Sequence, residues 1–195
     1  MKEEYTEDLN KLKQELPPIA LSILNNSGTK ITVFDNLHSI DKEGNIIPRI
    51  GRYYANKNKI YLDSKKVDRY TFISEVIHAV QNYLKMTDSG NSNLEFQEHV
   101  IKDLYFRKLL KRYKDIKYSK ALFTSNNENY SKFIDNIFDD NQILDLNKFL
   151  DSIGLFFEDF QRNHSSVGAY QKRKVDNYNY NWEKILKIFG VEYKY

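Results

Sequence analysis

Residues 71–84 read Thr-Phe-Ile-Ser-Glu-Val-Ile-His-Ala-Val-Gln-Asn-Tyr-Leu, and their pattern decides how the chain folds around them. Apolar residues recur at intervals of three and four, which predicts an amphipathic helix (Ile73, Val76, Ile77, Val80 and Leu84). The opposite face carries polar groups (Ser74, Glu75, His78, Gln81 and Asn82). In a chain that is 29% charged, fourteen residues would hold about four charges, but this stretch holds only Glu75. We therefore expect the polar face to be enclosed and to form the wall of a cleft.

The composition indicates one globular domain spanning residues 1–195. Of the 195 residues 41% are hydrophobic, and the 3 prolines and 7 glycines do not gather into a linker. The net charge of +3 is too small to demand a membrane or a nucleic acid, so we expect neither as a partner. The absence of cysteine excludes disulfides and thiolate metal sites.

The sequence leaves the compartment open. It has no run of about 18 apolar residues, and its first residues are too acidic and polar for a signal peptide. A cytoplasmic location is expected if the sequence is full length. A secreted or periplasmic location is expected if an export signal has been removed from it.

Periodicity and turn residues predict strands in the first third of the chain and helices in the rest. Extended segments are expected at 30–34 and from 46, with a β-hairpin formed by 52–55 and 59–62. Helices are expected at 3–16, 19–24, 71–84, 94–113, 130–138, 145–160 and 182–189, with Asp145 as an N-cap. The predicted class is α+β, predominantly helical, with a small antiparallel sheet beside the 71–84 helix.

The hairpin and the helix after it resemble one segment of the zincin-like metallopeptidases. In that family an edge strand precedes a helix bearing His-Glu-x-x-His, whose two histidines bind Zn²⁺ while the glutamate polarises the attacking water. The corresponding residues here are Ser74-Glu75-Val76-Ile77-His78. The resemblance implies that Glu75 is the catalytic general base and that His78 is a metal ligand. It also implies that Ser74 replaces the first histidine, so that peptidase activity is lost.

The segment Ser92-Asn-Leu-Glu-Phe-Gln-Glu-His99 extends the resemblance to the following helix, where such families place a glutamate as third ligand. It is also similar to an Asn-x-Glu-Phe-Glu stretch of uncharacterised zincin-like proteins from gut bacteria. The resemblance covers residues 46–106. The nearby residues of suitable type leave open, as an alternative to the loss of the metal, a rebuilt site formed by His78 with Glu95 or Glu98 and His99, in which Asp103 orients His99.

Each of these residues also has a structural interpretation. Glu75 and His78 can form a hydrogen-bonded pair, and Glu98 can meet a lysine, a tyrosine hydroxyl or helix-terminal amides. A basic run continues the second helix and is typical of a solvated face or of a nucleic-acid contact (Arg107, Lys108, Lys111, Arg112, Lys114, Lys117 and Lys120).

Three functions remain open from the sequence. The first is a degenerate zincin fold that binds a peptide or protein in the former substrate cleft through Ser74, Gln81 and Asn82, without a cofactor. The second is a divergent zinc-dependent hydrolase in which Glu75 is the general base. The third is a helical carboxylate site, because Glu75-x-x-His78 has the spacing of di-iron bundles, although Glu95-x-x-Glu98 lacks the matching histidine. We expect the polar face of 71–84 and the turn 95–99 to form one continuous site.

Overall fold

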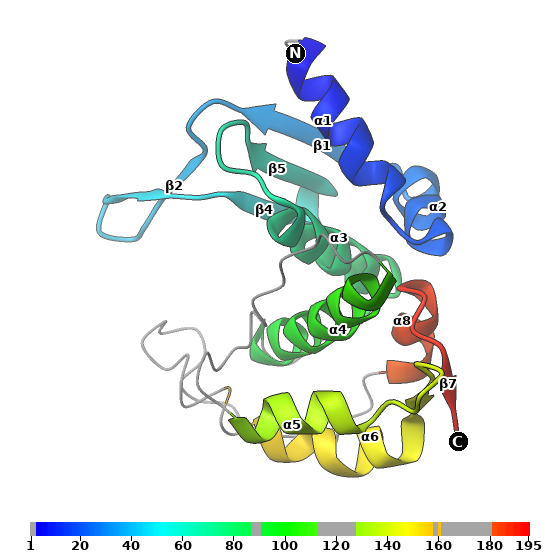
Figure 1. Cartoon of the computed structure of the whole chain (residues 1–195). Coiled ribbons are helices and arrows are strands. Elements are labelled where there is room, and N and C mark those ends of the chain that lie inside the picture. The colour runs from blue at the N-terminus through cyan, green and yellow to red at the C-terminus, as the bar shows by residue number, and fades with distance from the viewer. Residues whose placement is uncertain (1–2, 87–90, 113–127, 158–159, 161–180) are drawn as a thin grey trace. The chain divides into compact units, whose positions relative to one another are not determined.

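The computed structural model describes residues 3–86, 91–112, 128–157, 160 and 181–195 (Figure 1). The chain divides into two compact units, Met1–Lys85 and Met86–Tyr195, each of which is described by itself. The predicted single domain over 1–195 stays a prediction, because a domain is defined by cooperative unfolding and not by compactness alone. In the described part of the chain, no helix is long and apolar enough to cross a membrane.

The first unit begins with two helices that two consecutive prolines separate. Helix α1 spans Glu3–Gln14 and α2 spans Pro18–Asn26. Pro18 occupies the first turn of α2, where a missing backbone N–H costs nothing because no helical carbonyl could accept from it. Helix α2 packs against α3, which spans Arg69–Tyr83. The carboxylate of Asp68 accepts from the backbone N–H of Thr71 at 2.7 Å and fixes the start of α3.

A three-stranded sheet lies beside these helices, in the order β1-β5-β4. Strand β4 (Gly51–Tyr54) and β5 (Lys59–Asp63) form the predicted hairpin, joined by the 3₁₀ turn η1 (Ala55–Lys57). Strand β1 (Lys30–Phe34) pairs with β5 in parallel. The sheet is therefore mixed, and the predicted antiparallel pairing holds for the hairpin but not for β1. A parallel partner requires a long connection, and the 24 residues 35–58 supply it.

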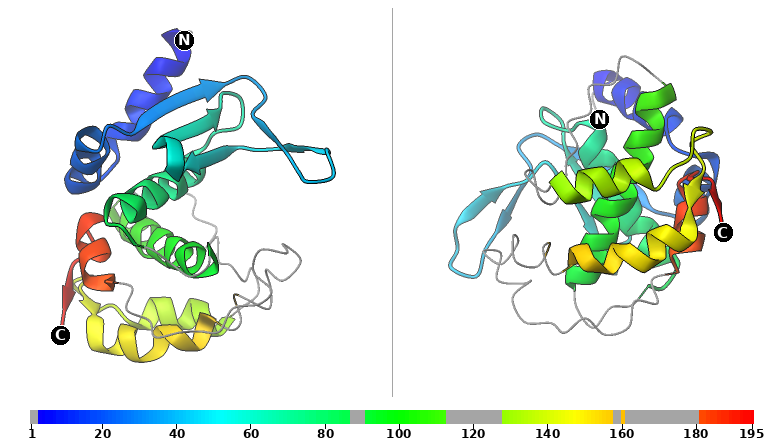
Figure 2. Two further views of the ribbon diagram at one scale, coloured as in Figure 1. Left: turned by 180° about the vertical axis from the view of Figure 1, so that it is seen from behind. Right: turned by 60° about the horizontal axis from the view of Figure 1, so that its bottom comes forward.

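Part of that connection is a second hairpin that the sequence did not reveal in full. Strands β2 (His38–Ile40) and β3 (Ile46–Pro48) pair in antiparallel fashion around a turn at 41–45. This hairpin extends away from the three-stranded sheet (Figure 1 and Figure 2). The turn is closed by Asp41, whose carboxylate accepts from the backbone and side chain of Asn45. These hydrogen bonds also lower the pKa of Asp41.

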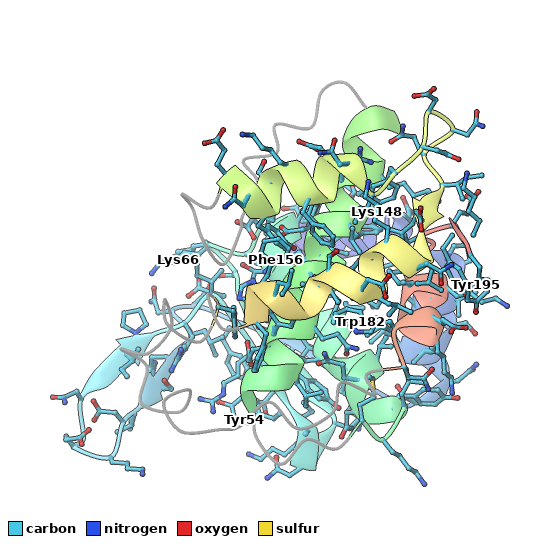
Figure 3. The ribbon with its side chains drawn as sticks, turned by 90° about the horizontal axis from the view of Figure 1, so that it is seen from below. Tyr54, Lys66, Lys148, Phe156, Trp182 and Tyr195 are labelled. Carbon is cyan, nitrogen blue, oxygen red and sulfur yellow. The ribbon has the colours of Figure 1, made fainter. Side chains whose placement is uncertain are left out.

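The second unit is helical and has an aromatic core. Its described elements are α4 (Asn91–Arg112), α5 (Glu128–Asn136), β6 (Leu144–Asp145), α6 (Leu146–Ile153), η2 (Gly154–Phe156), α8 (Trp182–Ile188) and β7 (Tyr193–Lys194). Aromatic rings of α5, α6, η2 and α8 contact one another. The ring centroid of Phe133 lies 6.3 Å from that of Phe149 and 5.0 Å from that of Phe156, and the centroids of Phe149 and Trp182 are 5.1 Å apart. Figure 3 labels Phe156 and Trp182 among these side chains.

The helix predicted over 145–160 is not one continuous α-helix, because a 3₁₀ turn interrupts it. Asp145 is its N-cap, as predicted, and accepts from the backbone N–H of Lys148 at 3.0 Å. The α-helix then ends at Ile153 and tightens into η2 at Gly154, where a glycine weakens helix propagation. The structure thus confirms the α+β class, mostly helical, with its small sheet in the first third of the chain.

Candidate functional site

The motif Ser74–His78 lies wholly inside α3, as the sequence predicts. Val76 and Ile77 are fully buried, which places the apolar face in the core. Ser74, Glu75 and His78 are half-buried on the other side of the helix. The polar face is therefore partly enclosed, in agreement with its low charge.

Glu75 lies against the first residue of β4. A Cβ atom added to Gly51 would stand 2.5 Å from Cγ2 of Thr71, 3.1 Å from Cγ of Glu75 and 3.3 Å from its Oε1. A β-carbon does not fit at 2.5 Å, so only glycine lets the strand approach α3 this closely. The close approach holds the Glu75 carboxylate beside the backbone of β4.

The other end of α3 reaches the same strand through a chain of hydrogen bonds. The Asn82 amide donates to the hydroxyl of Tyr53 at 2.8 Å, and that hydroxyl donates to Oδ1 of Asn58 at 3.0 Å. Asn58 also accepts from Thr29 at 2.8 Å and donates to the carbonyl of Ser27 at 2.7 Å. Burial raises the pKa of Tyr53, and the bond from Asn82 opposes the rise. Tyr53 is therefore a neutral phenol that connects the strand, the helix and the loop before β1.

Strand β4 is an edge strand, and one contact shows which of its residues direct their backbone groups toward β5. The N–H of Asp63 donates to the carbonyl of Ile50 at 2.8 Å, so residues 50 and 63 form a hydrogen-bonded pair. Such pairs alternate along an antiparallel ladder, so Arg52 and Tyr54 bond to β5. Gly51 and Tyr53 then direct their backbone N–H and C=O groups away from β5, toward the outer edge of the sheet.

His78 shares the face of α3 that follows this strand. Residues 71, 75, 78 and 82 are spaced by four, three and four, which places them on one side of a helix. Nδ1 of His78 lies 2.9 Å from Oε1 of Gln81, a buried side chain. Because an amide oxygen only accepts, Nδ1 donates, and the lone pair of the neutral ring is on Nε2. The structure thus pairs His78 with Gln81, a partner that the sequence-based interpretation did not consider.

The remaining predicted ligands lie in α4, in the second unit. Glu98 is 2% exposed and meets Lys102, with Oε1 2.9 Å from Nζ. Its Oε2 is 3.4 Å from Nδ1 of His99, and the two atoms form no hydrogen bond. Glu95 and His99 are half-buried. Of the partners considered for Glu98, the structure shows a lysine, which pairs with this carboxylate within the same helix.

Asp103, expected to orient His99, accepts a hydrogen bond from the hydroxyl of Tyr130 at 3.1 Å. Both Asp103 and Tyr130 are fully buried, so this contact ties α4 to α5 inside the second unit.

Two cations of the predicted basic face hold the second unit together. Arg107 is 8% exposed and lies 4.0 Å from the ring centroid of Phe138, where it donates to Gln142 at 2.9 Å and to the carbonyl of Asp135 at 3.2 Å. Lys108 donates to the carbonyl of Gly190 and lies 3.0 Å from Glu192. The predicted solvated face is thus wrong for Arg107, which is buried, whereas Lys108 is half-buried. The side chains of Lys111, Arg112, Lys114, Lys117 and Lys120 lie outside the described residues.

Across the ranges that the structure describes, no three histidine or carboxylate side chains gather closely enough to hold a metal ion. The predicted ligands belong to different units, with His78 in the first and Glu95, Glu98 and His99 in the second. A continuous site that includes both helices therefore stays a prediction.

Comparison with known proteins gives no assignment. No family model matches the chain, and no curated protein or solved structure matches it. The resemblance to zincins therefore rests on the sequence of residues 46–106 alone.

Three residues that position Glu75 and Asn82 were not predicted to do so. Gly51 could have been suspected, because a glycine that opens a strand often marks a close backbone approach. Asn58 has a positive φ of 47°, which asparagine tolerates and which closes the hairpin. Nothing in the sequence links Tyr53 to Asn82, because 29 residues separate them.

Proposed function

We propose that this chain is a zincin-like protein without peptidase activity that binds an extended peptide along the outer edge of β4. The observation that carries the proposal is the close approach of Gly51 to Glu75, which sets an edge strand beside the polar face of α3. An extended peptide that joins a sheet edge gains main-chain hydrogen bonds, and neighbouring side chains give it specificity.

The order of elements supports the zincin likeness. An antiparallel edge strand, β4, is followed by β5 and then by the helix that carries Glu75 and His78. This is the order that the resemblance implies for the substrate strand and the active helix. The polar groups of α3 that lie closest to β4, Glu75 and Asn82, would face a peptide bound there.

Ser74 supports the absence of hydrolysis. A catalytic zinc site takes three protein ligands and leaves one position open, and two of those ligands come from the histidine pair of the helix. A serine hydroxyl is a poor zinc ligand beside imidazole, so α3 retains one ligand, His78. Without a bound metal ion, Glu75 has no activated water to deprotonate.

Proline scanning of β4 tests the binding mode. Tyr53→Pro removes the tyrosine side chain and the backbone N–H that points away from β5, whereas Tyr53→Ala removes the side chain and keeps that N–H. The probe is a chymotryptic digest of casein added to ¹⁵N-labelled protein, with the amide signal of Gly51 followed by NMR. We expect saturable shifts of the Gly51 amide in the wild type and in Tyr53→Ala, and none in Tyr53→Pro.

Equal binding by the two variants, or a digest from which nothing binds the wild type, would contradict the proposal. Circular dichroism of both variants verifies that they fold. Mass spectrometry of the digest after incubation with the protein tests whether peptidase activity is lost. We expect no newly cleaved peptides. Chelator-sensitive cleavage that Glu75→Gln abolishes would overturn it.

A second candidate is a divergent zinc-dependent hydrolase, favoured by the hydrogen bond between His78 and Gln81. Metal-binding histidines commonly donate their second nitrogen to an oxygen, which leaves the other nitrogen for the ion. Metal analysis of protein purified without zinc or chelator separates the candidates. Stoichiometric metal, with a melting temperature that rises on zinc addition and falls in His78→Ala, would favour the hydrolase.

A further inference from the structure

The face of the three-stranded sheet opposite α3 carries a row of aromatic rings. Residues paired across strands point to the same face, so Phe34, Tyr61 and Tyr54 share one side of β1, β5 and β4. The ring centroids of Phe34 and Tyr61 are 5.0 Å apart, and those of Tyr61 and Tyr54 are also 5.0 Å apart. One ring from each strand therefore forms a continuous row across the sheet.

This aromatic face is accessible, unlike the other side of the same strands. Phe34 is 41% exposed, and Tyr61 and Tyr54 are half-buried. On the side that packs against α3, Ile60 and Leu62 are fully buried. Rings that are neither in the core nor isolated on the surface are the type of platform on which planar ligands stack.

Cations surround the row. Lys30, Arg52 and Lys59 share its face by strand register, and Lys57 of η1 lies with Nζ 5.7 Å from the Tyr54 centroid. Arg52 lies with Cζ 4.9 Å from the same centroid. Within the described ranges none of these four cations forms an ion pair with a carboxylate.

The one carboxylate of these strands does not neutralise the cations. Asp63 is fully buried and accepts from the backbone N–H groups of Leu37 at 2.7 Å and Lys65 at 2.9 Å. The face therefore combines three aromatic rings with four uncompensated positive charges.

We propose that this face binds single-stranded nucleic acid, with bases stacked on Phe34, Tyr61 and Tyr54 and phosphates held by Lys30, Arg52, Lys57 and Lys59. A polyanion whose subunits carry exposed planar rings satisfies both features at once. Unpaired bases stack on aromatic side chains of a sheet surface and on arginine planes, and lysines follow the backbone. An acidic polypeptide would satisfy the charges but not the row of rings, and a duplex hides the faces of its bases.

The charge of the whole chain did not reveal this face, because a net charge of +3 averages over a surface on which most charges of both signs balance. The binding proposed here involves the side-chain face of the sheet and not the outer backbone edge of β4. It is thus independent of peptide binding.

Fluorescence anisotropy with labelled 12-nucleotide oligomers of thymidine and of uridine tests the proposal. We expect saturable binding of at least one oligomer that weakens as salt rises. Tyr61→Leu keeps an apolar side chain in place and removes the ring, so affinity should fall at least about fivefold. Tyr61→Phe should retain binding. Lys57→Gln should lower the slope of log affinity against log salt by about 0.7, the share of one phosphate contact on a single strand.

Matched controls come from the same unit. Tyr83→Leu removes a tyrosine that is 50% exposed at the end of α3, and Lys42→Gln removes a cation from the turn before β3. Neither should change binding, and Tyr53→Pro should leave it intact even where it abolishes peptide binding. Failure of both oligomers to bind, an equal loss in Tyr61→Leu and Tyr83→Leu, or displacement by polyglutamate at the same charge concentration would overturn the proposal.

Discussion

Helices α3 and α4 both carry the residue types of a metal or catalytic site, but they use them differently. In α3, Glu75 and Asn82 face outward to an edge strand, through Gly51 and Tyr53 respectively. In α4, charged groups are neutralised inside their own unit, as the pair of Glu98 and Lys102 shows. The two helices show that residue type alone does not mark a site. What distinguishes them is where the contacts lie: those of Glu75 and Asn82 connect α3 to an edge strand, whereas Glu98 and Lys102 pair within α4.

The largest expected effect comes from breaking the buried pair of α4. Glu98→Ala removes the carboxylate that pairs with Lys102, a side chain that is only 7% exposed, so the free energy of unfolding should fall by about 3–5 kcal/mol. Urea denaturation followed by Trp182 fluorescence measures it, since Trp182 lies in the second unit. The matched control is Glu128→Ala in α5. This substitution breaks an i, i+4 ion pair in which the Lys132 side chain is 65% exposed and the Glu128 side chain 78% exposed. It should change the free energy of unfolding by less than about 0.5 kcal/mol. Equal losses in the two variants would show that Glu98 is not a structural residue.

An intermediate effect is expected where β4 meets α3. Gly51→Ala places a Cβ atom 2.5 Å from Cγ2 of Thr71, and this overlap should destabilise the protein by about 1–3 kcal/mol. Thr71→Ser removes Cγ2, so the double variant should regain most of the loss. Thermal unfolding followed by far-ultraviolet circular dichroism measures both. A double variant no more stable than Gly51→Ala would mean that the approach of α3 to β4 is looser than described.

The same variant tests the predicted single domain. If residues 1–195 unfold as one cooperative domain, Gly51→Ala should also shift the Trp182 transition, although the two residues lie in different units. A Trp182 transition that stays in place would show that the units unfold separately.

The smallest effect concerns an exposed charge of the second unit. Asp139 accepts from Lys194 at 2.6 Å and from the backbone N–H of Ile143 at 2.9 Å, and these contacts, the lysine first, lower its pKa below the usual 3.8. A carboxylate whose pKa is lower in the folded state stabilises that state above its unfolded pKa, and the contribution is lost as pH falls through the folded pKa. The wild type should therefore lose stability as the pH falls below about 4, and Asp139→Asn should lose less over the same range. Melting temperatures measured at a series of acidic pH values would show the difference. An unchanged acid profile would mean that this contact contributes nothing.

Local sequence by itself determined the elements of the fold. The apolar period of 71–84, the tandem prolines and the short turn of the 52–62 hairpin each act within a few residues, so α3, the end of α1 and the β4–β5 hairpin were predictable. The i, i+4 spacing of Glu98 and Lys102 is equally local, which is why a lysine partner for Glu98 could be foreseen.

Only the tertiary structure decided which residues from distant parts of the chain meet. The parallel pairing of β1 with β5 joins residues 29 positions apart, and the contacts of Gly51 with Glu75 and of Tyr53 with Asn82 depend on how the hairpin packs on α3. Arg107 was predicted to be a surface cation because it lies in a basic run of sequence. In the structure Phe138, Asp135 and Gln142 contact it instead. Such contacts close long loops, and their free energy comes from packing and burial that no short window of sequence records.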